Sequence, residues 1–289
     1  MLRVSDAATL REQLDAWRAG GERIGFVPTM GNIHEGHLRL VDAARRHAAR
    51  VVVSVFVNPT QFDQADDFER YPRTLDADAA ALAGCGVDLL LTPTVDVMYP
   101  DGLDLAAHIE PTRGAQPLEG EFRPGHFRGM ATVVAKLLNL VQPHCAVFGE
   151  KDYQQLAVVR AMVRELLLPV EIIGLPTVRE ADGLAMSSRN QYLTPAERAL
   201  APRLHAALQA AAREGAVPDA PLAAIEAHQT NVLNEAGFRV EYFQFRNAQL
   251  APPAPVDRRR VVLAAAWLGK ARLIDNQPFD VARGPGAPR

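Results

Sequence analysis

Apolar and polar residues follow two different periods in the first half of the chain. A near-continuous β-branched run at residues 51–57 predicts a strand buried on both faces. Further strands are predicted at residues 23–27, 87–91, 145–148 and 170–174. Apolar residues at helical spacing predict helices that start near Ser5 and Gly36, and others at about residues 74–83, 129–141 and 153–167. Strands that alternate with helices indicate an α/β fold with a Rossmann-like, doubly wound parallel sheet, which binds ligands at the carboxyl ends of its strands.

The pattern changes after about Thr177. Alanine-rich helical segments at residues 195–213 and 222–234 precede strand-like segments at 239–245 and 261–267. The sequence therefore predicts two domains, a Rossmann-like domain over residues 1–176 and a smaller α+β domain over residues 177–289.

Composition narrows the class of protein. Of the 289 residues, 48% are hydrophobic and 22% are charged, and the net charge of −3 gives no reason to expect a nucleic-acid or membrane partner. No apolar run approaches the roughly 18 residues that span a bilayer, and the first residues show helical spacing in place of a signal-peptide pattern. Two cysteines provide no disulfide framework. A cytoplasmic protein is expected.

The segment Pro28–His37 follows a predicted strand and leads into a predicted helix. Gly31 and Gly36 allow the backbone to approach a ligand closely, and the free N–H groups of a helix start attract phosphate. His34 and His37 lie three residues apart and share one helix face, where they could offset charge as pyrophosphate leaves. A glycine turn with two surface histidines is the alternative. No nearby Cys or His set completes a zinc site.

Two further polar segments follow predicted strands. Asn58 and Gln61 carry amides that can bond a carboxylate or a hydroxyl, although an Asn-Pro turn explains the first of them equally well. In the segment Gly149–Gln155, Lys151 can reach a phosphate and Asp152 could hold ribose or magnesium. Simple helix capping would explain Asp152 but not Lys151.

Met186–Arg189 lies at the expected domain junction, where two hydroxyls and a guanidinium could clamp phosphate, although Ser-Ser-Arg is common in loops. The chain contains neither a Gly-x-x-x-x-Gly-Lys-Ser/Thr loop nor a Gly-x-Gly-x-x-Gly segment after its first strand. The sequence thus argues against a P-loop hydrolase and against a dinucleotide oxidoreductase.

Taken in order, these segments resemble the pantothenate synthetase family, together with residues 67–74, 123–129, 133–139 and 272–276. The resemblance spans about residues 25–276. It implies membership of the His-x-Gly-His nucleotidyltransferase superfamily, and Met186–Arg189 is similar to the mobile phosphate-clamping loop of class I aminoacyl-tRNA synthetases. It also implies two steps: pantoate and ATP give pantoyl adenylate and pyrophosphate, and β-alanine then gives pantothenate and AMP.

The resemblance further implies Mg²⁺ with ATP, a homodimer, and a second domain that closes over an ATP and pantoate site in the first. Its motifs imply the ATP-binding residues Met30, Gly31, Asn32, Ile33, His34, Glu35, Gly36, His37, Gly149, Glu150, Lys151, Asp152, Val178, Met186, Ser187, Ser188 and Arg189. Val178 would lie against adenine. The expected catalytic residues are His37, as the acid, with His34, Lys151 and Arg189. The expected substrate residues are Gln61 for pantoate and then β-alanine, Gln155 for pantoate, and Asn58.

No protein ligand of magnesium is assigned, and Asp76 and Asp78 are candidates only. The chain departs from the family pattern at His144, expected at a strand entrance, and at Arg39, which could alter the charge near the histidines. Two alternatives stay open. A relative in the same superfamily would make a stable nucleotidyl product, and a regulatory module would bind ATP without turnover.

Overall fold

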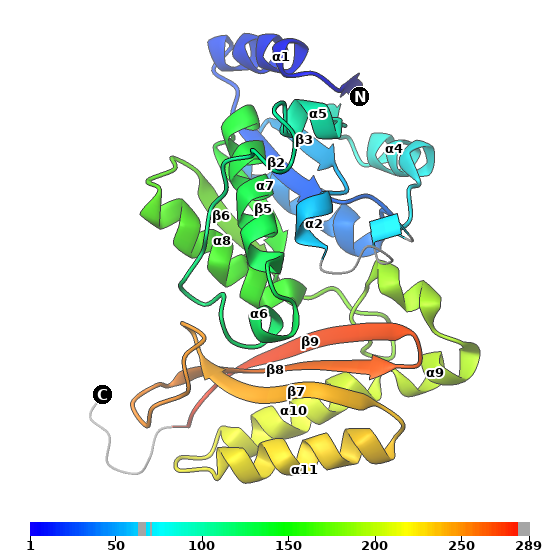
Figure 1. Ribbon diagram of the computed structural model, residues 1–289, viewed down its shortest axis with the longest axis vertical. Helices are drawn as coiled ribbons and strands as arrows, with labels where there is room; N and C mark the ends of the chain where they lie inside the picture. The colour runs from blue at the N-terminus through cyan, green and yellow to red at the C-terminus, as the bar shows by residue number, and fades with distance from the viewer. Residues whose placement is uncertain (63–67, 70, 283–289) are drawn as a thin grey trace. The chain divides into compact units, whose positions relative to one another are not determined.

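The computed structural model describes residues 1–62, 68–69 and 71–282 (Figure 1). Contacts divide the chain into two compact units. The first consists of Met1–Glu150 and Gln154–Pro176, and the second of Lys151–Tyr153 and Thr177–Arg289. Across the described residues, no helix has the length and apolar character needed to cross a membrane.

The first unit is built on a six-stranded sheet in which every strand pairs in parallel with its neighbours. The strand order is β1-β4-β3-β2-β5-β6. The strands are β1 (Leu2–Val4), β2 (Ile24–Thr29), β3 (Arg50–Val55), β4 (Leu89–Leu91), β5 (Cys145–Gly149) and β6 (Glu171–Leu175). The predicted doubly wound parallel sheet is confirmed, and the short strand β1 is an addition to the predicted set.

Helices cover both faces of this sheet. The long ones are α1 (Ala7–Ala19), α2 (Glu35–His47), α4 (Leu75–Gly84), α7 (His126–Val141) and α8 (Tyr153–Glu165), and the short ones are α5 (Val95–Met98), α6 (Glu119–Phe122), η1 (Pro59–Gln61) and η2 (Glu150–Asp152). Helix α1, which was predicted to start near Ser5, is capped by Asp6, whose carboxylate accepts the N–H of Thr9.

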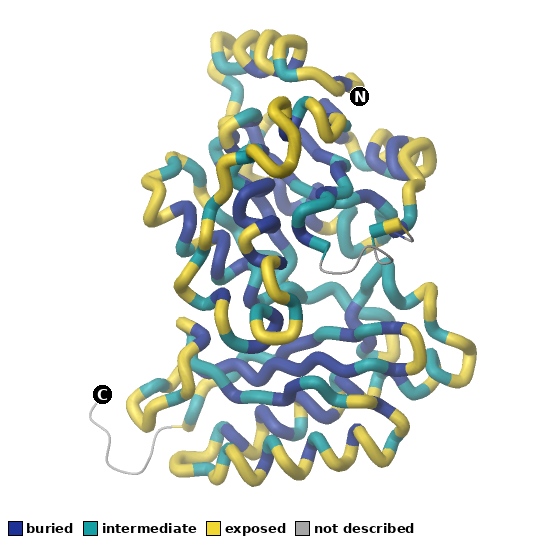
Figure 2. Tube along the Cα trace, in the orientation of Figure 1, coloured by how far each residue is buried: buried dark blue, intermediate teal, exposed yellow. Residues whose placement is uncertain are grey.

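Successive residues of each central strand enter different apolar clusters. Phe26 packs in the cluster under α1, α7 and α8, whereas Val27 packs in the cluster under α2 and α4. Ala146 and Val147 divide in the same way. Burial on both faces explains why these strands read as continuous apolar runs, and Figure 2 shows the buried strands at the centre of the unit.

The strand order reverses between β2 and β5, since the chain continues from β2 to β3 on one side and β5 lies on the other. Parallel sheets bind ligands at such a switch point, beyond the carboxyl ends of the strands. The segments that begin at Met30, Phe56 and Glu150 follow the three adjacent strands β2, β3 and β5. The topology therefore gathers the first two predicted segments, and Gly149 and Glu150 at the start of the third, at one edge of the sheet.

The second unit contains an antiparallel sheet of β7 (Arg239–Asn247), β8 (Arg259–Leu268) and β9 (Ala271–Asp280). Its helices are η3 (Ser188–Tyr192), α9 (Pro195–Leu200), α10 (Arg203–Gly215) and α11 (Leu222–Glu235). Helices α10 and α11 lie along one face of the sheet (Figure 1) and share an apolar cluster with it. The predicted α+β character is confirmed.

Two predictions for this half need correction. The helix expected over residues 195–213 is two helices, because Pro202 precedes α10 and its ring removes a backbone N–H that a continuous helix would use. Strand β9 was not predicted, since its polar residues Arg272, Asp275 and Asn276 obscure an apolar pattern.

Candidate active site

The two histidines shape the start of helix α2. His34 is the N-cap, and its Nδ1 accepts the N–H of Gly36 at 3.1 Å. The Nδ1 of His37 accepts the N–H of His34 at 3.3 Å, and the two ring centroids lie 4.1 Å apart. A ring nitrogen that accepts a backbone N–H carries no proton, so each neutral ring has its proton on Nε2. The motif therefore presents two imidazole N–H donors at a helix N-terminus, where the helix dipole also favours an anion.

The loop before these histidines has a backbone that few residues adopt. Gly31 has φ +86° and Asn32 has φ +52°. The carboxylate of Asp78 accepts the N–H of Asn32 at 3.0 Å and that of Ile33 at 2.8 Å. It also accepts the hydroxyl of Thr74 at 3.1 Å. Asp78, which is 3% exposed, thus holds the predicted ATP loop in this conformation.

Asn58 is buried and fully engaged within the protein. It is 1% exposed, and its Nδ2 donates to Gln61 Oε1 and to the carbonyl of Gly129, both at 3.2 Å. Its Oδ1 accepts the hydroxyl of Tyr99 at 2.7 Å. Gln61 Nε2 lies 3.0 Å from the sulfur of Met30. The structure therefore brings Gln61 together with one predicted ATP residue, while Asn58 fixes the Gln61 amide.

Burial shifts the pKa of two groups near Asn58, those of Tyr99 and Lys136. Burial raises the pKa of Tyr99, against the opposing effect of its hydrogen bond with Thr60. Burial also lowers the pKa of Lys136, whose Nζ donates to the carbonyl of Met98 at 2.7 Å and lies 4.2 Å from the Tyr99 ring centroid. Tyr99 therefore remains a neutral hydrogen-bond donor to Asn58 around neutral pH.

Residues 123–129 carried the family resemblance without an assigned role, and they support Gln61. His126 Nδ1 lies 2.9 Å from the Gln61 carbonyl oxygen, and Arg123 Nη2 donates to the same oxygen at 3.4 Å. A Cβ added at Gly129 would overlap the backbone carbonyl of Thr60. Polar residues and a glycine at the start of an otherwise apolar helix were the only sequence signal for this support.

The adjacent glutamines of α8 differ in environment. Gln154 is 3% exposed, donates to the carbonyls of Gly114 at 2.8 Å and Pro117 at 2.6 Å, and accepts the N–H of Glu119 at 3.1 Å. Gln155 is half-buried, and its amide forms no hydrogen bond with any residue that the structure describes. Gln154 is thus structural, whereas the Gln155 amide remains available to a ligand.

Other predicted residues lie in the second unit. Lys151 and Ser187 line one narrow pocket with Asn190 and Asp275. Ser187 Oγ accepts the N–H of Arg189 at 3.3 Å and caps η3. Lys151 Nζ lies 3.8 Å from Asp152 Oδ1, and the Asp152 side chain is 46% exposed. The second unit therefore gathers the predicted lysine and the start of the Ser-Ser-Arg segment.

The remaining predicted ATP-binding residues lie in different environments. Val178 accepts the N–H of Met186 at 3.0 Å through its carbonyl. Glu150 and Ser188 are half-buried. A Cβ added at Gly149 would meet no atom within 4 Å among the described residues beyond its two chain neighbours, which leaves that backbone open to a ligand.

The two departures from the family pattern have local explanations. Arg39 pairs with Glu35 at 2.9 Å and approaches Asp42 at 3.8 Å, so neighbouring carboxylates offset its charge on α2. His144 lies just before β5, as predicted, and its Nδ1 accepts the N–H of Ile24 at 3.0 Å.

Neither Asp76 nor Asp78, the two acidic candidates for magnesium ligands, is placed to form a cluster of metal-binding side chains. Asp78 is occupied by the loop, and the side chain of Asp76 is 98% exposed beside Arg3. Within residues 1–62, 68–69 and 71–282, no group of three or more His, Cys, Asp and Glu could hold a metal ion.

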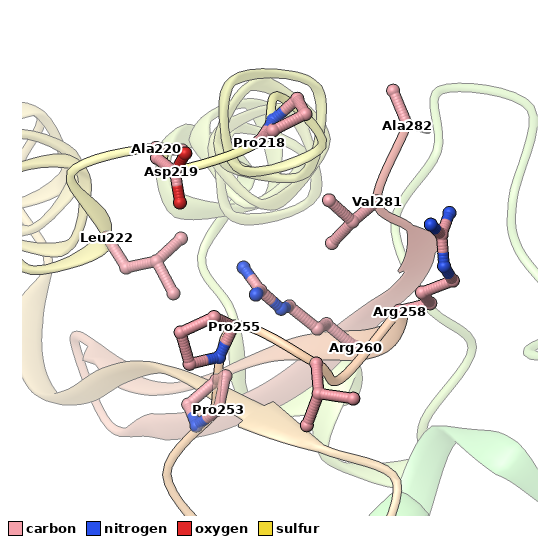
Figure 3. Close-up of a pocket in the computed structure, with 11 residues that line it drawn as sticks. Pro218, Asp219, Ala220, Leu222, Pro253, Pro255, Arg258, Arg260, Val281 and Ala282 are labelled. Atoms are coloured by element: carbon pink, nitrogen blue, oxygen red, sulfur yellow. The ribbon is translucent and has the colours of Figure 1, made fainter. Parts of the chain in front are cut away.

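A cavity of about 500 Å³ in the second unit lies apart from these residues (Figure 3). Figure 3 shows the guanidinium of Arg260 directed into it, between Pro255 and Leu222. The cavity is lined by none of the predicted site residues.

Known proteins resemble the chain over nearly its full length. The family model for pantoate-β-alanine ligase matches residues 3–278. A pantothenate synthetase of Aeromonas hydrophila is 51% identical over 284 residues, which cover 98% of this chain and 100% of that protein. One of Thioalkalivibrio sulfidiphilus is 53% identical over 282 residues, which cover 97% and 99%.

Solved structures agree. Pantothenate synthetase from Thermus thermophilus is 47% identical, covers 96% of this chain and 99% of its own, and has a TM-score of 0.88. A pantoate-β-alanine ligase from Francisella tularensis, complexed with β-γ ATP and β-alanine, is 36% identical, covers 99% and 100%, and has a TM-score of 0.81. The family expected from the sequence motifs is confirmed: this chain belongs to the pantoate–β-alanine ligase family, also called pantothenate synthetases.

Proposed function

We propose how this chain, a ligase that forms pantothenate from pantoate, β-alanine and ATP, divides its reaction between its residues. In the first step a pantoate carboxylate oxygen attacks the α-phosphorus of ATP, and the bond to the β-phosphate breaks. Pyrophosphate leaves, and pantoyl adenylate remains. In the second step the β-alanine nitrogen attacks the acyl carbon, AMP leaves, and the amine loses a proton.

The first step joins two negatively charged groups, so donors and cations must screen their repulsion. The observation that carries our assignment is the pair of Nδ1 acceptors, which leaves His34 and His37 with Nε2–H donors at the start of α2. We assign His37 the acid role toward the departing pyrophosphate: its Nε2–H donates a hydrogen bond to the leaving oxygen and keeps its proton. His34, Lys151 and Arg189 share the screening of the phosphates.

Amide side chains hold the acid and the amine. Gln61 holds pantoate and then β-alanine, and Gln155, whose amide has no hydrogen bond to the described part of the chain, holds pantoate. Amides suit this task because they can accept from a hydroxyl and donate to a carboxylate. Asn58 was expected to contact substrate, but its burial and its bond to Gln61 favour a positioning role.

ATP is the nucleotide substrate, and we propose that Mg²⁺ arrives bound to its phosphates. This ion would supply additional charge neutralisation on the leaving group. The lack of a three-residue metal cluster among the described residues is compatible with an ion held mainly by phosphate and water.

The test is pyrophosphate release from ATP with pantoate alone, followed by AMP and pantothenate formation after addition of β-alanine. We expect pyrophosphate in the first assay and amide product only in the second. Pyrophosphate release that requires β-alanine from the start would contradict the adenylate. Lys151→Ala should lower the rate of pyrophosphate release about 10²–10³-fold, as removal of a single charge-stabilising donor does elsewhere. Near-normal release by a folded Lys151→Ala variant would refute its role.

We also propose a homodimer that works in the cytoplasm. The edge strand β6 has half-buried Ile172 and Ile173, and Leu167 nearby is 86% exposed. An exposed apolar edge strand is suited to pairing with a second copy. Both cysteines are free, as in a reducing compartment. Light scattering should give twice the chain mass, and a Leu167→Glu variant should give the mass of one chain.

A further inference from the structure

Lys151 follows strand β5 of the first unit in sequence, yet residues Lys151–Tyr153 belong by their contacts to the second unit. One hydrogen bond connects this short segment to strand β9. Asn276 Nδ2 donates to the backbone carbonyl of Lys151 at 3.0 Å. Asn276 is 3% exposed, so this bond is protected from competing water. The backbone of the proposed phosphate-binding lysine is therefore held by a buried side chain of β9.

Asn276 is itself fixed by an ion pair. Arg179 donates to both carboxylate oxygens of Asp275, at 2.7 and 2.9 Å. Asp275 Oδ1 accepts the N–H of Asn276 at 2.8 Å, and Arg179 Nη2 donates to the Asn276 carbonyl at 3.4 Å. Asp275 is 4% exposed. A two-point guanidinium–carboxylate pair in this setting restricts rotation of both side chains and so fixes the backbone of β9 at Asn276.

The same arginine organises the segment that leads to Met186–Arg189. Arg179 forms a backbone bridge with Ala185, and its Nη1 donates to the carbonyl of Gly183 at 3.1 Å. Asn190 Nδ2 donates to the carbonyl of Ala185 at 3.1 Å. The Arg179 guanidinium thus fixes the segment that precedes Met186–Arg189. Through Asp275 it also fixes Asn276, the residue that holds Lys151.

We propose that Asn276, fixed by the Asp275–Arg179 pair, is a positioning residue that holds Lys151 in a set relation to Met186–Arg189. The inference rests on the proposed phosphate-binding roles of Lys151 and Arg189. Lys151 and Ser187 already line the same narrow pocket. Cations that are placed before ATP binds need no reorganisation during the reaction, whereas a misplacement of about 1 Å can cost about 10²-fold in rate.

The test is a double-mutant cycle of Asn276→Ala and Lys151→Ala, measured as pyrophosphate release with saturating pantoate and ATP. We expect Asn276→Ala alone to lower kcat about 10–100-fold and to leave KM for pantoate unchanged. In the Lys151→Ala background it should have less than about a twofold further effect, because a residue that acts through Lys151 cannot act without it. Gln277→Ala is the matched control. Among the residues that the structure describes, its amide bonds only the local Pro278 carbonyl, and pyrophosphate release should be unchanged.

Equal losses from Asn276→Ala in both backgrounds would overturn the inference and leave the role of Lys151 intact. Near-normal release by Lys151→Ala alone would instead overturn the proposed role of Lys151, and this inference with it. Thermal unfolding of each variant establishes that it is folded. If Asn276→Ala does not fold, Arg179→Lys enters the same cycle, because it keeps the charge beside Asp275 and loses the two-point geometry.

Discussion

Replacement of Asp78 by asparagine tests whether a carboxylate on α4 holds the loop that precedes the two histidines. The variant keeps the shape of the side chain but replaces one charged acceptor by an NH₂ group. That group would face a backbone N–H of Asn32 or Ile33, which now donates to Asp78 at 3.0 and 2.8 Å respectively. One charge-assisted bond is lost, and two donors come to face each other.

The size of the effect follows from these contacts. A hydrogen bond to a charged group contributes about 1.5–3 kcal/mol, so the free energy of unfolding should fall by about that amount. For domains of this size the melting temperature should fall by about 3–12 °C, at roughly 2–4 °C per kcal/mol. If the loop must regain this conformation before ATP reacts, the same free energy is added to the barrier. Since about 1.4 kcal/mol corresponds to a factor of ten, kcat/KM for ATP should then fall about 10–100-fold.

Asp76→Asn is the matched control. It makes the same chemical change two residues away, on a side chain that is 98% exposed and 3.5 Å from Arg3. Its stability should change by no more than about 0.5 kcal/mol. Pyrophosphate release and thermal unfolding are measured for both variants across a magnesium titration. An Asp78→Asn variant as active as Asp76→Asn would refute the anchoring role, and recovery at high Mg²⁺ would indicate a metal ligand instead.

Three further predictions use the same assays. Gly129→Ala should destabilise the protein by about 2 kcal/mol or more, because its Cβ overlaps a backbone carbonyl, whereas Gly84→Ala, with open space around it, should be tolerated in denaturant unfolding. Gln154→Ala should lower stability without a selective effect on pantoate, and Gln155→Ala should raise KM for pantoate at unchanged stability; the reverse pattern would exchange their roles. Burial acts to raise the pKa of Asp275, but the neighbouring His205 ring, 3.5 Å away, and the two hydrogen bonds from Arg179 outweigh this and hold the pKa below its usual value. A lowered folded-state pKa stabilises above the unfolded value of about 3.9, so the stability difference between wild type and Asp275→Asn should be constant from about pH 7 to 5 and shrink as the pH falls below about 4.

The strands of the first unit could be predicted because burial on both faces leaves a strong local pattern. Strand β3 is a near-continuous apolar run, interrupted by Ser54, and it was placed within two residues at each end. The first two chemical segments, and the start of the third, could be placed for a related reason, since carboxyl ends of parallel strands share one edge of a sheet. Strand β9 could not be predicted, because Asp275 and Asn276 are buried polar residues in positions where a sequence pattern would expect apolar ones.

The roles of Asp78 and Gly129 could not be predicted from the sequence, for a different reason. Asp78 lies in α4 and bonds backbone N–H groups 45 and 46 positions earlier in the chain. Gly129 gives room to the backbone beside Gln61, which lies on a different segment. Neither effect has a local signature, because a backbone N–H or carbonyl is present at nearly every position and reveals nothing about its distant partner.

Lys151 shows most clearly what the residue types of a motif leave open. The sequence correctly placed it after a strand of the parallel sheet, and that position suggests a residue carried by the sheet. Its contacts instead place it in the second unit, where Asn276 holds its backbone. A lysine positioned by the parallel sheet and a lysine positioned by the second unit differ in which residues fix the place of the ammonium group. If the effects of the Asn276 and Lys151 substitutions are non-additive, then strand β9 contributes a residue that supports adenylate formation. This is the strand whose buried polar residues prevented its prediction from the sequence.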